Sequence, residues 1–141
     1  MIGRGGGNIA TNTIIGSGAL QSNTTGTGNT ANGYQALFSN ITGYANTAIG
    51  NLSLTANTTG YANTALGNRT LLSNSTGTYN TAIGDNSMTG NTTGSYNTAV
   101  GASALEMNTT GNFNTANGVN ALEMNTVGSS NTALGFQALV L

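Results

Sequence analysis

The 141-residue chain contains no cysteine, proline, histidine, tryptophan or lysine, and only two basic and three acidic residues. The missing cysteines exclude a disulfide scaffold. Without histidine, lysine or cysteine, the usual combination of nucleophile, base and orienting group cannot be assembled, so we expect no enzyme activity. A net charge of −1 argues against nucleic-acid binding, which needs clustered positive charge. No apolar run approaches the roughly 20 residues of a membrane span, and no signal peptide is visible.

What the chain has instead is a strict tandem repeat. Asn-Thr-Ala, or Asn-Thr-Ile in the first copy, returns every 17 residues from Asn12 to Asn131 without insertion or deletion. The unit reads N-T-A-x-G-x-x-A-L-x-x-N-T-T-G-x-x, and its residues are numbered below as positions 1 to 17. A fixed period near 20 residues is typical of a solenoid. We therefore predict a Gly-rich leader over 1–11 and an all-β parallel solenoid of eight 17-residue coils over 12–141, the last one truncated.

Glycine marks two turns in each coil, at positions 5 and 15, where a positive φ or a close approach of neighbouring coils favours glycine. The segments between them, Asn-Thr-Ala-x and x-Ala-Leu-x, are each predicted to form a strand of three to five residues. Helices are disfavoured by the Asn, Thr and Gly content. The glycines of the central coils are Gly50, Gly67 and Gly84 at position 5, and Gly60, Gly77 and Gly94 at position 15.

Stacked coils turn each position into a ladder of like side chains about 4.8 Å apart. Two positions are asparagine, and each is predicted to form an amide ladder in which every side chain bonds to the next. The ladder residues of the central coils are Asn46, Asn63 and Asn80 at position 1, and Asn57, Asn74 and Asn91 at position 12.

Apolar or small residues recur at positions 3, 4, 8 and 9. Adjacent residues of a strand point to opposite faces, so we expect positions 3 and 4 on opposite faces, and likewise 8 and 9. One face fills the narrow core, and the other exposes an apolar stripe that a second copy covers. The pattern leaves open which stripe is the interface. The candidates are Ile49, Leu66, Ile83 and Val100 at position 4, which Asn32 and Asn117 interrupt, or Leu54, Leu71 and Leu105 at position 9.

The sequence Asn-Thr-Ala-Ile-Gly, with Leu and Val variants at its fourth residue, resembles the Ser-Val-Ala-Ile-Gly motif of YadA-like head repeats. Those repeats belong to trimeric autotransporter adhesins and to related phage tail fibres. The resemblance covers 12–141, although the family repeat is usually shorter and its valine is threonine here. It implies a left-handed parallel β-roll, three chains around one axis, and an adhesive or spacer role at a cell surface or on a virion. A host receptor or glycan is the partner this implies. The motif stands at 46–50, 63–67, 80–84, 97–101 and 131–135.

Two further groups of residues could carry chemistry. Glu106 and Glu123 share position 10 of successive coils. Their carboxylates could lie about 5 Å apart, as in retaining glycosidases, but we interpret them as solvent-facing copies of one repeat. An aromatic stripe at positions 16 and 17 could stack on sugars, but we favour a structural role in holding the coils together. Its members are Tyr44, Tyr61, Tyr79, Tyr96 and Phe113.

These patterns predict a non-catalytic structural fibre or adhesin segment, without cofactor or metal, that assembles with copies of itself outside the cell. One alternative is an extracellular filament that grows head-to-tail through uncapped solenoid ends, the last coil stopping at Leu141. Another is an ice- or carbohydrate-binding solenoid. Ice binding would need the Thr column of position 2 on a flat exposed face, and Thr pairs in an alternating Thr-x-Thr pattern. The Thr pairs of this chain are instead consecutive, as at Thr24 and Thr25, and lie in a predicted loop.

Overall fold

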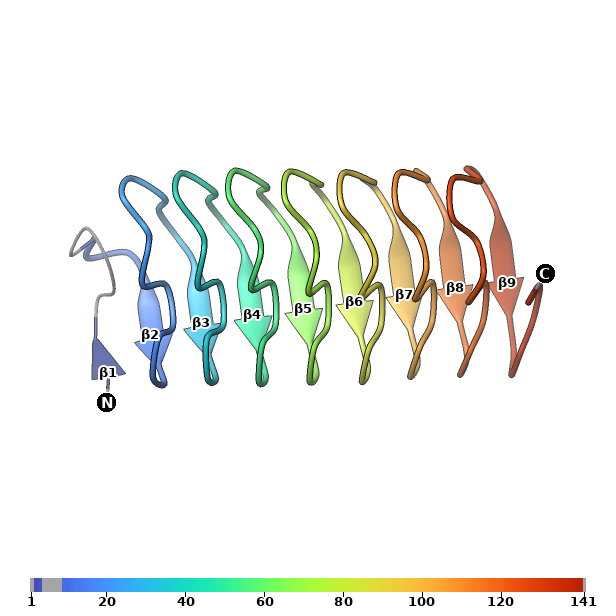
Figure 1. Cartoon of the computed structure of the whole chain (residues 1–141), viewed down its shortest axis with the longest axis horizontal. Coiled ribbons are helices and arrows are strands. Elements are labelled where there is room, and N and C mark those ends of the chain that lie inside the picture. Colours follow the sequence, from blue (N-terminus) through green and yellow to red (C-terminus); the bar gives the residue numbers. More distant parts are fainter. Residues whose placement is uncertain (1, 4–8, 141) are drawn as a thin grey trace.

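The computed structural model describes residues 2–3 and 9–140, which form a solenoid of stacked coils (Figure 1). Its nine strands make one sheet in chain order. From β2 to β9 every pairing is parallel with a shift of 17 residues, as between Thr47 and Thr64. The predicted all-β parallel solenoid is confirmed. The strands are β1 (Ile2–Gly3), β2 (Thr13–Ile15), β3 (Thr30–Asn32), β4 (Thr47–Ile49), β5 (Thr64–Leu66), β6 (Thr81–Ile83), β7 (Thr98–Val100), β8 (Thr115–Asn117) and β9 (Thr132–Leu134).

The predicted leader contributes a strand of its own. β1 pairs antiparallel with β2, so that Ile2 lies opposite Ile15 and Gly3 opposite Ile14. β1 therefore covers the edge of β2 that faces away from β3. The prediction of an uncapped solenoid end is wrong at this end of the stack. Residues 4–8 of the leader lie outside the described part of the chain. No helix in that part is long and apolar enough to cross a membrane.

Only the first of the two predicted strands of each coil exists. Positions 7 to 11 form turns, and positions 7 and 9 have a positive φ, for example 57° at Leu52 and 50° at Leu54. The Leu52 N–H donates to the Tyr34 carbonyl of the preceding coil, whereas the Leu54 N–H donates to the Thr70 carbonyl of the next coil, at 2.9 and 3.0 Å. Hydrogen bonds between coils thus hold this segment although its dihedrals are not those of a strand.

This backbone changes where the apolar columns point. Ala48 at position 3 is fully buried and Ile49 at position 4 is partly exposed, as expected on a strand. Ala104 and Leu105, at positions 8 and 9, are both fully buried. The prediction that positions 8 and 9 lie on opposite faces is wrong, because alternation applies only to extended backbone.

The position-9 column is the main filling of the core. Leu54, Leu71 and Leu105 have no exposed surface within their own chain, so they are not available to a second chain. This corrects their candidacy as an oligomer interface. The core also contains the small residues of positions 3 and 8. The largest apolar side chains that are fully buried are Leu20, Leu37, Leu54, Leu71, Met88 and Leu105.

The two glycine columns exist for different reasons. Gly50 at position 5 has a φ of +135°, and a Cβ there would meet the Gly67 carbonyl carbon at 2.6 Å. Gly60 at position 15 has no positive φ, but a Cβ there would meet Asn57 Oδ1 and, at 2.5 Å, the Gly77 carbonyl oxygen. Gly67 and Gly84 follow the first pattern, and Gly77 and Gly94 follow the second.

Candidate functional site

The first amide ladder runs through position 12 along the inside of the rod. Asn57 Nδ2 donates to Asn40 Oδ1 of the preceding coil at 2.8 Å and to the Gly60 carbonyl of its own turn at 3.0 Å. The same two bonds recur at Asn74. The side-chain bonds continue without a gap from Asn23 to Asn125.

The second ladder lies at position 1, where each strand begins. Asn46 Oδ1 accepts from the backbone N–H of Asn63 at 3.0 Å and from Asn63 Nδ2 at 3.2 Å. Asn63 Nδ2 also donates to the Gly77 carbonyl at 2.8 Å. This ladder therefore ties the start of a strand to a turn 14 residues further along.

The two ladders are joined at one atom in every full-length coil. The Gly77 carbonyl oxygen accepts from Asn63 of the first position and, at 3.1 Å, from Asn74 of the twelfth. The Gly60 carbonyl does the same for Asn46 and Asn57. A Cβ on Gly77 would collide with Asn74 Oδ1 and with the Gly94 carbonyl oxygen, the acceptor of the next coil, which explains the glycine at position 15.

The interior can contain these buried amides because each of them is hydrogen-bonded. Burying an amide without a partner costs about 1–3 kcal/mol. Among the described residues, no buried side-chain nitrogen or oxygen lacks a partner. In both ladders each side-chain oxygen, from Asn12 to Asn114 and from Asn23 to Asn108, accepts a hydrogen bond from the following coil, so the side-chain dipoles of both ladders point the same way along the rod.

A third ladder lies outside and runs in the opposite direction. Asn51 Nδ2 donates to Asn68 Oδ1 at 2.8 Å, and Asn68 Nδ2 donates to Asp85 Oδ1 at 2.7 Å. Asn86 Nδ2 also donates to the Asp85 carboxylate, at 3.2 Å. This ladder was not predicted; its only signal in the sequence is Asn, Asn and Asp at position 6 of successive coils.

The aromatic residues form one continuous row. Tyr44 and Tyr61 stack at a centroid distance of 4.7 Å, and Tyr79, Tyr96 and Phe113 stack at 5.0 and 5.1 Å. Between the groups, Tyr61 meets Tyr79 edge-on at 5.3 Å, where the row changes from position 16 to position 17. The stripe that the sequence presented as discontinuous is thus bridged by an edge contact.

Tyr44, Tyr79, Tyr96 and Phe113 are exposed and Tyr61 is partly buried, yet the rings influence one another. The pKa of Tyr79 is raised from 10, first by the charge that Tyr61 would carry and then by desolvation and the remaining tyrosines. A Tyr61 hydrogen bond acts in the same direction. Stacking covers both faces of Tyr96 and one face of each of the other four rings.

The outer face of the sheet is made of two columns, at positions 2 and 4. Thr47 and Thr64 are partly exposed, and Leu66 has 40% of its surface exposed. The position-4 candidates lie in one row, because Ile49 pairs with Leu66, and so on through Ile83 to Val100. Of the two candidate stripes, this is the one that the chain leaves accessible.

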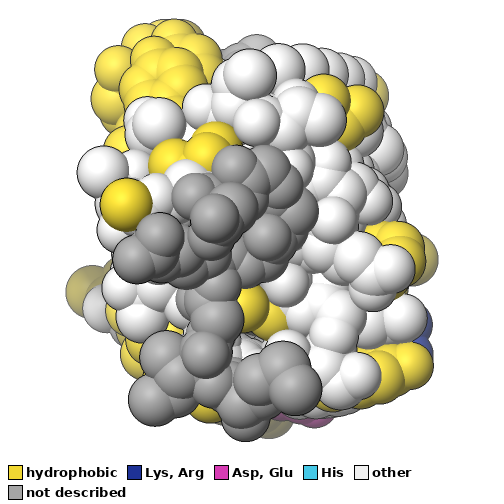
Figure 2. Space-filling model, turned by 90° about the vertical axis from the view of Figure 1, so that its left-hand side faces the viewer, with side chains coloured by type: hydrophobic (Ala, Val, Ile, Leu, Met, Phe, Trp, Pro, Cys, Tyr) yellow, Lys and Arg dark blue, Asp and Glu magenta, His cyan; other side chains and the backbone are white. Residues whose placement is uncertain are grey.

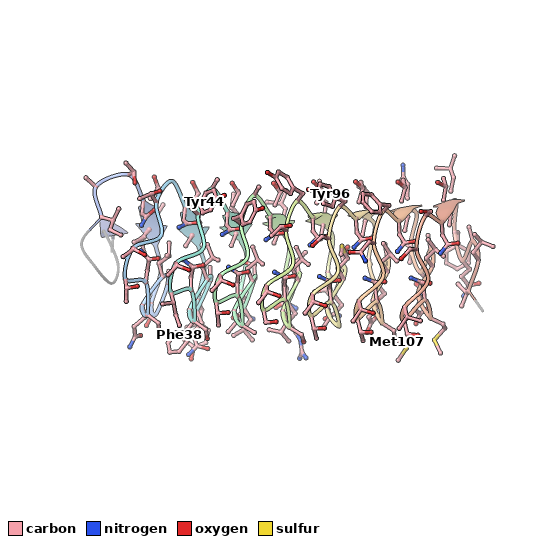
Figure 3. The ribbon with its side chains drawn as sticks, turned by 90° about the horizontal axis from the view of Figure 1, so that it is seen from above. Phe38, Tyr44, Tyr96 and Met107 are labelled. Carbon is pink, nitrogen blue, oxygen red and sulfur yellow. The ribbon has the colours of Figure 1, made fainter. Side chains whose placement is uncertain are left out.

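The rod has two long sides. The strands and the aromatic row, with Tyr44 and Tyr96, lie along one edge, and Phe38 and Met107 lie along the opposite edge (Figure 3). We call positions 1–4 the sheet side and positions 7–11 the turn side. Seen along the rod, hydrophobic side chains gather at separate points of the circumference, with the largest cluster at one corner (Figure 2).

The two glutamates lie on the turn side in unlike surroundings. Glu106 lines a shallow depression of about 410 Å³ that opens beside Gly90 and Met107. Glu123 accepts a hydrogen bond from Asn120 Nδ2. No group of three His, Cys, Asp or Glu suited to a metal ion occurs among the described residues.

No protein-family model matches the chain, and no curated protein and no solved structure matches it significantly.

Proposed function

We propose that the chain is a non-catalytic structural rod, a fibre or adhesin segment that assembles with copies of itself outside the cell or on a virion. The observation that carries this proposal is the pair of buried amide ladders, joined at one glycine carbonyl in each coil. The same bonds recur in coil after coil, so the molecule is built to hold a repeat and extend it.

The ladders also make the rod specific in register. A slip of one residue between coils would remove each buried asparagine from its partners and leave its amide unsatisfied. A stiff rod of defined length is the property that a spacer or fibre requires. Extracellular use and a receptor or glycan partner are part of this proposal and follow from the resemblance to head repeats.

Changing the number of coils tests the proposal. Deleting residues 63–96 removes two whole coils and should shorten the rod by about 10 Å, while the circular dichroism and cooperative melting stay those of the parent. The matched control deletes 63–92, which is not a multiple of 17 and should prevent folding. Small-angle scattering gives the length. An unfolded two-coil deletion, or one of unchanged length, would contradict a modular rod.

Ice binding is a second candidate, favoured by one observation. The Thr column, which includes Thr64, lies on the sheet side in strict register, on a face without charged residues. Thermal hysteresis of the parent, lost in Thr64→Leu and kept in Thr59→Leu on an exposed loop, would establish this function. No hysteresis in the parent removes it.

The other two alternatives have less support. Sugar stacking needs exposed ring faces, whereas stacking within the aromatic row covers both faces of Tyr96 and one face of each other ring. Head-to-tail growth by strand pairing at β2 requires β1 to leave the edge that it occupies.

A further inference from the structure

We propose that two rods pair antiparallel through the sheet side, about a two-fold axis that lies along the strand direction between β5 and β6. The partner is a second copy of this chain, and the inference rests on the proposed function as a self-assembling rod. The face concerned is the outer surface of positions 2 and 4, which contains no charged residue.

The position-4 column reads the same in both directions in its order of polar and apolar residues. Under the proposed axis, Leu66 lies opposite Ile83, and the next coils outward place aliphatic on aliphatic and then amide on amide. Ile15 and Leu134 extend the match by one coil at each end. The six central members are, in order, Asn32, Ile49, Leu66, Ile83, Val100 and Asn117.

The direction of the axis follows from the two columns. An axis along the strands reverses the rod but keeps the strand direction, so threonine packs on threonine and aliphatic on aliphatic. An axis parallel to the rod would place the Thr column against the aliphatic column instead. Face-to-face sheets pack about 10 Å apart, which side chains of this size fill.

The two asparagines define the register of the pair. An amide is both donor and acceptor, so Asn32 and Asn117 can bond to each other across the interface. A shift by one coil would bury each amide against an aliphatic side chain and leave it unsatisfied. A single buried asparagine sets the register of coiled coils in the same way.

Electrostatics favours the same direction. The dipoles of both amide ladders point one way along a rod, so antiparallel rods oppose them.

Cross-linking at single cysteines distinguishes these arrangements, because the chain has no cysteine of its own. Ile15→Cys and Leu134→Cys should be joined to each other by a bis-maleimide of about 10 Å, matching the spacing of packed sheets. Neither variant should cross-link alone, since like ends lie about 34 Å apart, seven coils, in an antiparallel pair. Ser39→Cys with Met124→Cys, on the turn side, is the matched control and should stay unlinked.

Several outcomes overturn the proposal: like-with-like cross-links at either end, which indicate parallel assembly, cross-links in the control, or a monomer in sedimentation equilibrium. These outcomes leave the coil-deletion test of the rod untouched, so the two proposals fail separately.

Substitution of the asparagines gives a second, independent readout. In the antiparallel pair, Asn32→Leu leaves Asn117 of the partner facing an aliphatic group. The dissociation constant of the dimer should therefore rise by about tenfold. The double variant Asn32→Leu/Asn117→Leu removes both amides and should bind at least as tightly as the parent. In a parallel assembly each asparagine faces its own copies, so the single variant would not weaken it. Sedimentation velocity over a concentration series measures the change, and an unweakened single variant rules out the antiparallel register.

Discussion

The sheet side and the turn side of each coil both stack on the neighbouring coils through backbone hydrogen bonds, but with different backbone conformations. On the sheet side, Thr47 to Ile49 are extended and pair in a regular parallel ladder. On the turn side, Leu52 and Leu54 have a positive φ. The Leu52 N–H donates to the preceding coil, whereas the Leu54 and Ala56 N–H groups donate to the next coil. A regular repeat therefore does not require a regular strand, provided that the hydrogen bonds between coils are complete.

The difference decides which apolar column is inside. Extended backbone turns Ile49 outward, whereas the turn-side backbone buries both of the neighbours Ala104 and Leu105. Two columns that look alike in the sequence thus have opposite roles.

A charge introduced at position 9 should prevent folding, whereas a charge at position 4 should prevent only self-association. Leu71→Asp buries a carboxylate in the core without a partner and should prevent folding, a loss of more than about 4 kcal/mol. Leu66→Asp on the sheet side should leave a folded monomer and abolish self-association. Circular dichroism and sedimentation velocity distinguish the two results. A folded Leu71→Asp variant that only dissociates would return position 9 to the interface.

Breaking a buried ladder should cost much more than breaking the exposed one. Asn74→Ala removes the donor to Asn57 and Gly77 and the acceptor of Asn91, and should lower the free energy of unfolding by about 3 kcal/mol. Asn68→Ala, in the exposed ladder, should lower it by less than about 0.5 kcal/mol. Urea denaturation measures both. Equal effects would mean that the interior amides contribute no more than surface ones.

A substitution to glycine should stabilise the rod on the turn side and destabilise it on the sheet side. Ser103 on the turn side has a φ of 53°, where a Cβ is unfavourable, so Ser103→Gly should stabilise the rod by up to about 1 kcal/mol. The first coil already has Gly18 at this position. Thr98→Gly in β7 should destabilise by about 1 kcal/mol, because an extended strand favours threonine. Thermal melts of the pair check the sign, and two destabilised variants would contradict the dihedral difference.

The aromatic row should show the smallest effect, in the titration of Tyr79. Its pKa is raised in the folded protein, so the folded state holds the proton more firmly than the unfolded state, and stability falls as pH rises through that pKa. Tyr61→Phe removes the largest cause and should lower the Tyr79 pKa toward its ordinary value. Ultraviolet titration near the phenolate band follows this shift, with Tyr34→Phe, outside the row, as the control. An unchanged titration in Tyr61→Phe would show that the rings are electrically independent.

Much of the candidate site was predictable from the repeat. Fixed spacing with no insertion requires like residues to stack, so Asn46 with Asn63 and Asn57 with Asn74 could be paired before any coordinates, and they are bonded. What could not be predicted is that both ladders meet at one glycine carbonyl, because that contact joins residues three and 14 apart across a turn. The exposed ladder ending at Asp85 was missed because position 6 follows no consensus.

The period, the parallel register and the two asparagine ladders follow from the sequence, because they depend on which residues recur every 17 positions. Which side of the coil is a strand, and therefore which apolar column is core, became known from the folded backbone. The physical reason is that side chains alternate between the two faces only on extended backbone. In the Ala-Leu segment the leucine has left-handed dihedrals, which leucine does not favour, and the segment forms its hydrogen bonds in that conformation.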